Sequence, residues 1–141
     1  MDMGSASSSN AQVGDLSNPT DRISHDDYGT TDCNQLNSGT CHAIRKELAK
    51  LLDDPSHDDG SWGPLFIRLA WHCSGTYSCT SNNGGSDGFT MRFDAERNDP
   101  ENAGVWQAVE RIISVRRKFP WVSRADLVIL AAYVAIEVRN I

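Results

Sequence analysis

Residues 61–77, with the sequence SWGPLFIRLAWHCSGTY, constrain the fold of this chain more than any other segment. Proline suits a first helical turn because it lacks an N–H and has a preset φ, so Pro64 predicts a helix start. The apolar periodicity from Leu65 onward predicts a helix, and Gly75 predicts its end. One face of this helix is suited to a protein core, because its side chains are apolar: Phe66, Leu69, Ala70 and Cys73.

The opposite face of the same helix carries side chains with reactive or polar groups. Arg68, Trp71 and His72 are spaced i, i+3 and i+4, so they share one face. A base and a fixed cation on one rigid element suit proton transfer and charge stabilisation on a small polar substrate. A lone histidine on a helix is more often a hydrogen-bonded core residue. Arg68 argues against that interpretation, since arginine is rarely buried without a partner.

The composition of the 141-residue chain excludes several classes of protein. The net charge is −6 and no basic stripe is visible, so nucleic acid is not an expected partner. No apolar run approaches the roughly 20 residues of a membrane span, so a membrane is not expected either. Residues 1–21 lack the basic start and apolar core of a secretory signal and the arginines of a mitochondrial presequence. A cytoplasmic location is the default expectation, with a mitochondrion or plastid as the alternative.

The cysteines match no zinc-finger spacing, and they are Cys33, Cys41, Cys73 and Cys79. A continuous helix would hold the Cα atoms of the last two roughly 9 Å apart, at a rise of about 1.5 Å per residue, which is too far for a disulfide. Free and mostly buried thiols are therefore predicted. A small metal-binding domain built from the Cys41-His42 and His72-Cys73 pairs is a remote alternative, because adjacent helical residues point in different directions.

The chain divides into a leader and a domain. Residues 1–32 are rich in Ser, Asn, Asp and Gly, which predicts a disordered leader, and residues 33–141 form the domain. Apolar periodicity predicts four helices in this domain, at about 39–53, 65–75, 103–118 and 126–138. A capping box of Ser123 and Asp126 precedes the last of these helices.

Two further features of the domain lead to expectations that a structure can test. Residues 79–88 are dominated by turn formers and predict a loop, and residues 89–104 are expected to be irregular. The helix at 126–138 is apolar almost all round, so it is expected to be buried on several sides. The three other helices are too short to cover it, so it is expected to lack some of its partners.

Several segments in order resemble the class I haem peroxidases, the group of cytochrome c peroxidase, ascorbate peroxidase and catalase-peroxidase. Residues 63–77 resemble the helix on the distal, peroxide-binding side of the haem. The sequence ERNDPENAG at 96–104 resembles the segment that bears the distal asparagine. Smaller matches are Gly84-Gly85 with Thr90-Met91-Arg92-Phe93, and Phe119-Pro120-Trp121 with Asp126-Leu127. The series spans roughly residues 40–138 and implies an all-α, haem-peroxidase-like helical domain.

The resemblance implies a role for each matching residue. His72 is the expected general base, which takes a proton from peroxide and returns it to the leaving oxygen. Arg68 is expected to stabilise the charge that develops as the O–O bond breaks, and Trp71 to stack over the haem face. The expected cofactor contacts are therefore Arg68 and Trp71. Asn102 is expected to accept a hydrogen bond from Nδ1–H of His72, and the carboxylate of Glu96 to brace this loop.

The implied function is that of an oxidoreductase, a haem b peroxidase that reduces hydrogen peroxide with electrons from a donor in the response to oxidative stress. Cytochrome c is favoured over ascorbate or another small reductant, because Gly60 stands where ascorbate enzymes carry a lysine. The family's proximal histidine, the ligand of the haem iron, has no match here, so no metal ligand is assigned. The chain is accordingly expected to be the truncated N-terminal, distal half of the domain. The alternative is a non-catalytic helical fragment that binds no haem.

Overall fold

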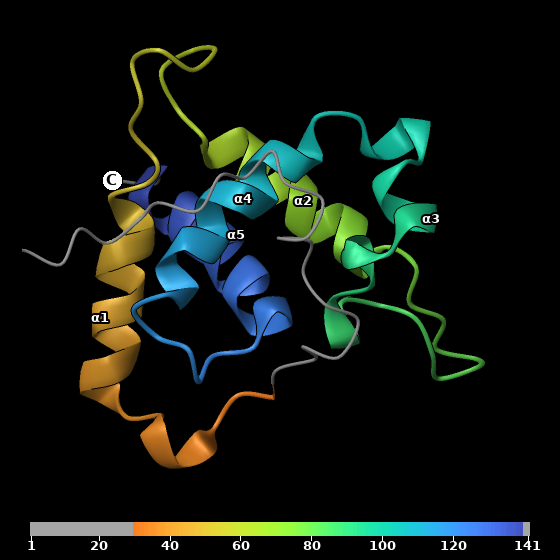
Figure 1. Cartoon of the computed structure of the whole chain (residues 1–141), viewed down its shortest axis with the longest axis horizontal. Helices are drawn as coiled ribbons and strands as arrows, with labels where there is room; N and C mark the ends of the chain where they lie inside the picture. The colour runs from red at the N-terminus through yellow and green to blue at the C-terminus, as the bar shows by residue number, and fades with distance from the viewer. Residues whose placement is uncertain (1–29, 140–141) are drawn as a thin grey trace, which may run out of the picture.

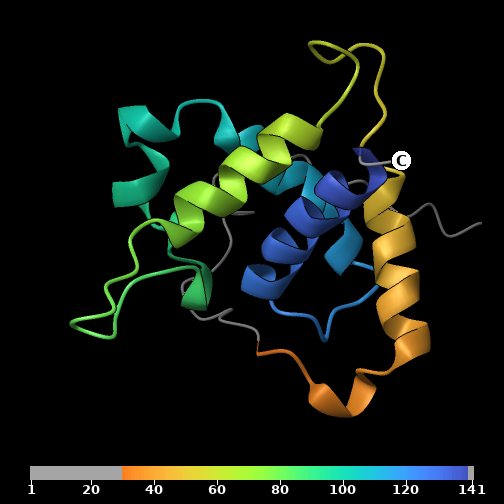
Figure 2. The same ribbon diagram turned by 180° about the vertical axis from the view of Figure 1, so that it is seen from behind.

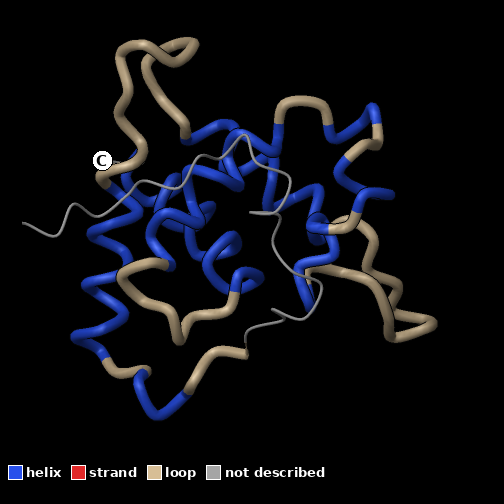
Figure 3. Tube along the Cα trace, in the orientation of Figure 1, coloured by secondary structure: helices blue, strands red, loops and turns tan. Residues whose placement is uncertain are grey.

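A computed structural model describes residues 30–139 of the chain. Of the leader expected at 1–32, residues 1–29 therefore lie outside the described residues. The described part is helical, which confirms the all-α class (Figures 1 and 3). Its α-helices are α1 Ser38–Ala49, α2 Gly63–Ser74, α3 Asp94–Arg97, α4 Val105–Arg116 and α5 Arg124–Arg139. Short 3₁₀ turns are η2 Cys33–Gln35, η3 Asp87–Arg92 and η4 Pro100–Asn102.

The helix α2 confirms the central prediction from the sequence. Pro64 lies in the first turn and Gly75 is the C-cap. The four apolar side chains of the expected core face are buried, with exposed fractions of 7% or less. This face packs mainly against α5 and also against α4, and Figure 2 shows α2 and α5 side by side. The helix α2 is therefore fixed along its buried face, while its opposite face is open.

The helix α1 is capped by a reciprocal pair of hydrogen bonds. The side chain of Asn37 accepts from the N–H of Thr40 at 3.0 Å, and the Thr40 hydroxyl accepts from the N–H of Asn37 at 2.9 Å. Such a box satisfies donors that a helix start leaves unpaired. The helix ends at Ala49 rather than at residue 53, because the chain tightens into a turn in which Leu51 N–H donates to Leu48 O.

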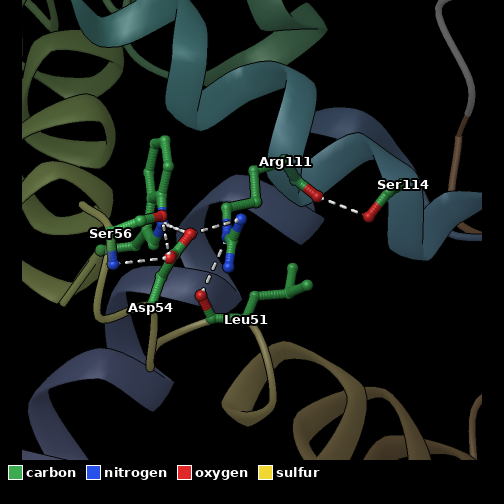
Figure 4. A network of polar contacts seen from close by, with 6 residues as sticks. Leu51, Asp54, Ser56, Arg111 and Ser114 are labelled. Carbon is green, nitrogen blue, oxygen red and sulfur yellow. Dashed lines mark hydrogen bonds and ion pairs between the residues drawn. The ribbon is translucent and has the colours of Figure 1, made fainter. Parts of the chain in front are cut away.

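The loop between α1 and α2 is held against α4 by a polar network, shown in Figure 4. Asp54 Oδ2 accepts from the indole N–H of Trp62 at 3.1 Å and pairs with Nη1 of Arg111 at 3.2 Å. Arg111 Nε also donates to the carbonyl of Leu51 at 3.0 Å. Hydrogen bonds from Ser56 and Trp62, with the charge of Arg111, lower the pKa of Asp54 to about 2. The N-terminal end of α2 is thus tied to α4.

The segment from 79 to 104 is partly as expected. Residues 79–86 form turns, and Gly84 has φ of 75° where an added Cβ would lie 2.3 Å from the carbonyl oxygen of Thr76. Only glycine tolerates both conditions. The expectation that residues 89–104 are irregular is wrong, because this segment contains most of η3, all of α3 and η4. Short helical turns need only a local cap, such as the Asp99 carboxylate that accepts from Glu101 N–H at 2.9 Å.

The start of α5 is capped more elaborately than the sequence suggests. Ser123 Oγ accepts from the N–H of Asp126 at 3.0 Å, as the capping box predicts. The hydroxyl of Thr31 accepts from the N–H of Ser123 at 3.0 Å and donates to the carboxylate of Asp126. The next residue, Asp32, donates its N–H to the carbonyl of Trp121 at 2.9 Å. The end of the expected leader therefore contacts the domain at the start of α5.

The neighbouring elements bury one side of α5 and leave the other side exposed, so the helix is less enclosed than the expected burial on several sides, and part of its apolar surface is uncovered. Leu127, Ala131 and Ala135 are fully buried, whereas Tyr133 is 60% exposed and Ile136 is 45% exposed. It packs against α1, α2, α4 and the 3₁₀ turn η3, and Figure 2 shows α5 beside α2. Among the helices of residues 30–139, none is long and apolar enough to cross a membrane.

The cysteines are free, as predicted, but they are not mostly buried. Cys73 alone is buried, on the core face of α2, and Cys41 is half-buried. Cys33 and Cys79 are exposed, because they lie in surface turns among polar residues rather than on a packed helix face.

Candidate active site

The three side chains on the open face of α2 differ sharply in their surroundings. Trp71 is 69% exposed, which is the largest exposed fraction among the large apolar side chains of residues 30–139. The rings of Trp71 and His72 meet edge to face, with their centroids 5.0 Å apart. His72 and Arg68 are half-buried, because a segment that runs from α3 to α4 lies against them. The spacing in the sequence thus places these residues on one face, with Trp71 free on its outer side.

His72 is hydrogen-bonded to Asn102, with Nδ1 and Oδ1 2.7 Å apart. The carboxamide of Asn102 donates through Nδ2 to the main-chain carbonyl of Glu96 at 2.8 Å. A carbonyl can only accept, so the NH₂ group of Asn102 must face Glu96 and its oxygen must face His72. That oxygen can only accept in turn, so Nδ1 of His72 carries a proton. In the neutral ring, Nε2 therefore keeps a free lone pair and can act as a base.

Arg68 is bound to the same segment by its guanidinium group. Its Nη1 donates to the carbonyl of Ala103 and its Nη2 donates to the carbonyl of Glu101, both at 2.8 Å. Arg68 and His72, one turn apart on α2, thus both bind residues 101–103. Two of the guanidinium N–H groups are used in this way, and the others remain available to a further acceptor.

Glu96 contributes its main-chain carbonyl to the site, and the brace through its carboxylate stays a prediction. The resemblance implies a brace through its carboxylate, whereas the contact in the structure is made by its main-chain carbonyl with Asn102. The Glu96 charge acts on Cys73. Burial raises the pKa of the Cys73 thiol to about 12, and the charge of Glu96 adds to this effect. Cys73 is therefore a neutral core thiol and not a nucleophile.

Sequence reasoning missed the groups that shape the segment around Asn102. The acceptors for Arg68 are main-chain carbonyls, which carry no signal in a sequence. The carboxylate of Asp99 caps η4, and an Asp-Pro pair before a helical turn is a signal that could have identified it. Within residues 30–139, no group of three or more His, Cys, Asp and Glu side chains could hold a metal ion, so the Cys/His metal site finds no support.

The family model described as peroxidase matches residues 44–140. The chain belongs to the peroxidase family. All the site residues described above lie within the matched part of this peroxidase chain. Family membership therefore agrees with the resemblance that the motifs around His72 and Asn102 carry.

The peroxidase chain is similar to several fungal proteins over its domain. It is 47% identical over 99 residues to a protein of Pyricularia oryzae named as a heme-binding peroxidase, covering 70% of this chain and 33% of that protein. It is 46% identical over 99 residues to a mitochondrial protein of Yarrowia lipolytica named as a cytochrome c peroxidase, covering 70% and 35%. A mitochondrial cytochrome c peroxidase of Neurospora crassa is 45% identical over 96 residues, covering 67% and 27%. The chain spans about a third of the length of these relatives.

Proposed function

We propose that this chain forms the peroxide-side wall of a haem peroxidase, an oxidoreductase that reduces hydrogen peroxide to water. The observation that carries the proposal is the hydrogen-bonded series His72, Asn102 and Glu96 carbonyl. This series fixes a proton on Nδ1 and leaves Nε2 free as a base, on the same helix face as a cation and an exposed indole. Membership in the peroxidase family supports haem as the cofactor.

The residues on the open face of α2 fit a haem. The exposed indole of Trp71 offers a flat apolar surface on which a planar macrocycle can pack. Arg68 has further N–H groups and a positive charge, which are available to polar groups of the haem or of the peroxide. Haem b is the form that the resemblance to class I haem peroxidases implies. When bound, the haem supplies the iron and the redox chemistry of O–O bond cleavage.

The side chains of this chain supply the proton transfers. His72 Nε2 takes a proton from one peroxide oxygen and returns it to the other, which leaves as water. Asn102 stabilises the imidazolium that forms between these two transfers, because its carbonyl keeps accepting from Nδ1–H. The free N–H groups of Arg68 stabilise the negative charge on the departing oxygen. In total, hydrogen peroxide, two electrons and two protons give two waters.

The test is the substitution His72→Leu in the haem-loaded protein. We expect the reaction with peroxide to slow by at least ~10²-fold, the usual effect of removing a general base. Haem binding should persist, since His72 is not assigned as an iron ligand. His42→Leu is the matched control, because His42 is an exposed histidine on α1. A stopped-flow rate for His72→Leu within a few-fold of wild type would remove His72 from this role, and a protein that takes up no haem would favour the non-catalytic alternative.

The proposed electron donor is cytochrome c. Two observations support it: Gly60 stands where ascorbate enzymes carry a lysine, and relatives from Yarrowia lipolytica and Neurospora crassa are named as cytochrome c peroxidases. Those names also favour a mitochondrial over a cytoplasmic location, and the reaction would then serve the response to oxidative stress. Steady-state rates with reduced cytochrome c and with ascorbate test the donor, and fractionation of cells tests the location. Faster turnover with ascorbate would overturn the choice of donor.

A further inference from the structure

The segment that carries Asn102 has no buried side chain to anchor it. Of residues 98–104, Asn102 is half-buried and the others are exposed. Figure 1 shows α3 and the adjoining turns at the side of the molecule opposite α1, at the edge of the fold. Packing does little to fix the position of a segment that has few buried apolar contacts. Its position relative to α2 therefore depends on its hydrogen bonds.

These hydrogen bonds fall into two groups with different effects. Asn102 N–H donates to Asp99 O at 2.9 Å and Ala103 N–H donates to Pro100 O at 3.1 Å, which shapes the turn itself. Bonds of this kind fix the local backbone but not where the turn lies on α2. The side chains of His72 and Arg68 supply the hydrogen bonds that join residues 98–104 to α2. Those of Arg68 reach main-chain atoms, so they act on the backbone that carries the Asn102 side chain.

We infer that Arg68 is a positioning residue for Asn102, and through it for the proton on His72 Nδ1. The carbonyl of Glu101 belongs to the peptide that precedes Asn102, and the carbonyl of Ala103 belongs to the peptide that follows Ala103. Arg68 thus fixes the backbone on both sides of Asn102 and so the direction of its side chain. The planar fork of a guanidinium suits two acceptors at a fixed separation, which a lysine ammonium does not. This role is additional to charge stabilisation, and it rests on the proposed function of His72 as a base.

The tautomer of His72 reports on this role directly, and it can be measured in the full chain without haem. Nitrogen NMR of ¹⁵N-histidine-labelled protein at pH about 8.5, above the usual histidine range, gives the ratio of the Nδ1–H and Nε2–H forms. The His72 signals are assigned by their loss in His72→Gln. Wild type should hold His72 in the Nδ1–H form. In Arg68→Ala the ratio should fall by about tenfold, the effect of one ordinary hydrogen bond.

Matched variants separate positioning from a general loss of structure. Asn102→Ala should shift the ratio as far as Arg68→Ala, and Arg68→Lys should shift it less, since one ammonium cannot span both carbonyls in the same way. Arg45→Ala is the control, because Arg45 pairs with Glu137 at a surface remote in sequence from the site and should leave the ratio unchanged. If Arg68→Ala does not fold, Arg68→Gln takes its place.

An unchanged tautomer ratio in a folded Arg68 variant would overturn the inference and leave the proposed function intact. A normal peroxide rate in His72→Leu would overturn the proposed function and leave intact the role of Arg68 in setting the tautomer of His72. The two failures are thus distinguishable, because the first is read without haem and the second is read from the haem-loaded protein.

Discussion

Two pairs of an arginine and a tryptophan lie along α2, and they are used in different ways: Arg111 of α4 with Trp62 at the N-terminal end, and Arg68 with Trp71 from the middle of α2 toward its other end. At the N-terminal end, Arg111 pairs with Asp54, donates to a carbonyl and lies 4.7 Å from the ring centroid of Trp62. His57 also stacks on this ring, with the centroids 3.5 Å apart. Toward the other end, from the middle of α2 onward, Arg68 contacts two carbonyls and Trp71 is 69% exposed.

The difference lies in charge and in contact area. Arg111 is neutralised by a carboxylate, and Trp62 is covered on its ring and bonded at its N–H. In the described part of the chain, Arg68 has no carboxylate partner within salt-bridge distance, so its charge is uncompensated. The N-terminal end therefore holds α2 in place, whereas the other end keeps a cation and a flat apolar surface available for a ligand.

The largest expected effect comes from truncating one tryptophan at each end. Trp62→Ala should lower the free energy of unfolding by about 3 kcal/mol, at the low end for a large aromatic because Trp62 is half-buried. Trp71→Ala should change it by no more than about 0.5 kcal/mol, as is usual for surface positions. Urea denaturation followed by circular dichroism measures both values. Equal losses at the two positions would break the comparison, since Trp71 would then be part of the scaffold.

A substitution of Asn102 tests the part of α2 that carries Arg68, Trp71 and His72, and it should change the rate of the reaction with peroxide rather than the stability of the fold. Asn102→Ala in the haem-loaded protein should slow the reaction with peroxide by about tenfold, the worth of one hydrogen bond that keeps Nε2 basic. The preference between electron donors should not change. Asn98→Ala is the control, because Asn98 is exposed in the same segment. An unchanged stopped-flow rate for Asn102→Ala would show that its bond to His72 does not matter for the reaction.

The sequence predicted what depends on local patterns. The bounds of α2 and its buried face follow from apolar periodicity and from Pro64 and Gly75, and all of these are local signals. The association of His72 with Asn102, which are 30 residues apart, came from the resemblance and not from any pattern. The contacts of Arg68 could not be predicted, because their acceptors are main-chain carbonyls whose direction depends on the fold of η4.

The missed features have the same physical origin. The contact of Thr31 with the start of α5 joins residues 95 apart in the chain, and no period or cap rule links them. The turns in 89–104 were missed because each is too short to show a period, and their caps come from single side chains such as Asp99. Local rules thus predict where helices lie, whereas hydrogen bonds from a side chain to the main chain of another segment become visible only in the structure.

The smallest expected effect concerns acid, to which the two ends should respond differently. The pKa of Asp54 is about 2 in the folded protein, against an ordinary value of 3.8, chiefly because Ser56 and Trp62 donate to it. Below pH 3.8 the unfolded state binds more protons than the folded state. The stabilisation is therefore complete above about pH 4 and is lost as the pH falls toward 2. At the other end, the partners of His72 and Arg68 are a carboxamide and carbonyls, which do not titrate in this range.

Asp54→Asn should thus flatten the dependence of stability on pH between about 4 and 2 and change it little above that window. Glu47→Gln is the positive control and should flatten the same window, because hydrogen bonds from Lys118 and Lys50 lower the pKa of Glu47 to about 2 as well, at a site away from α2. Urea midpoints measured at pH values from 2 to 6 give the slopes. Parallel curves for wild type and Asp54→Asn would show that the carboxylate at the N-terminal end is not stabilised by its partners. The distinction between a neutralised end and an uncompensated end of α2 would then fail.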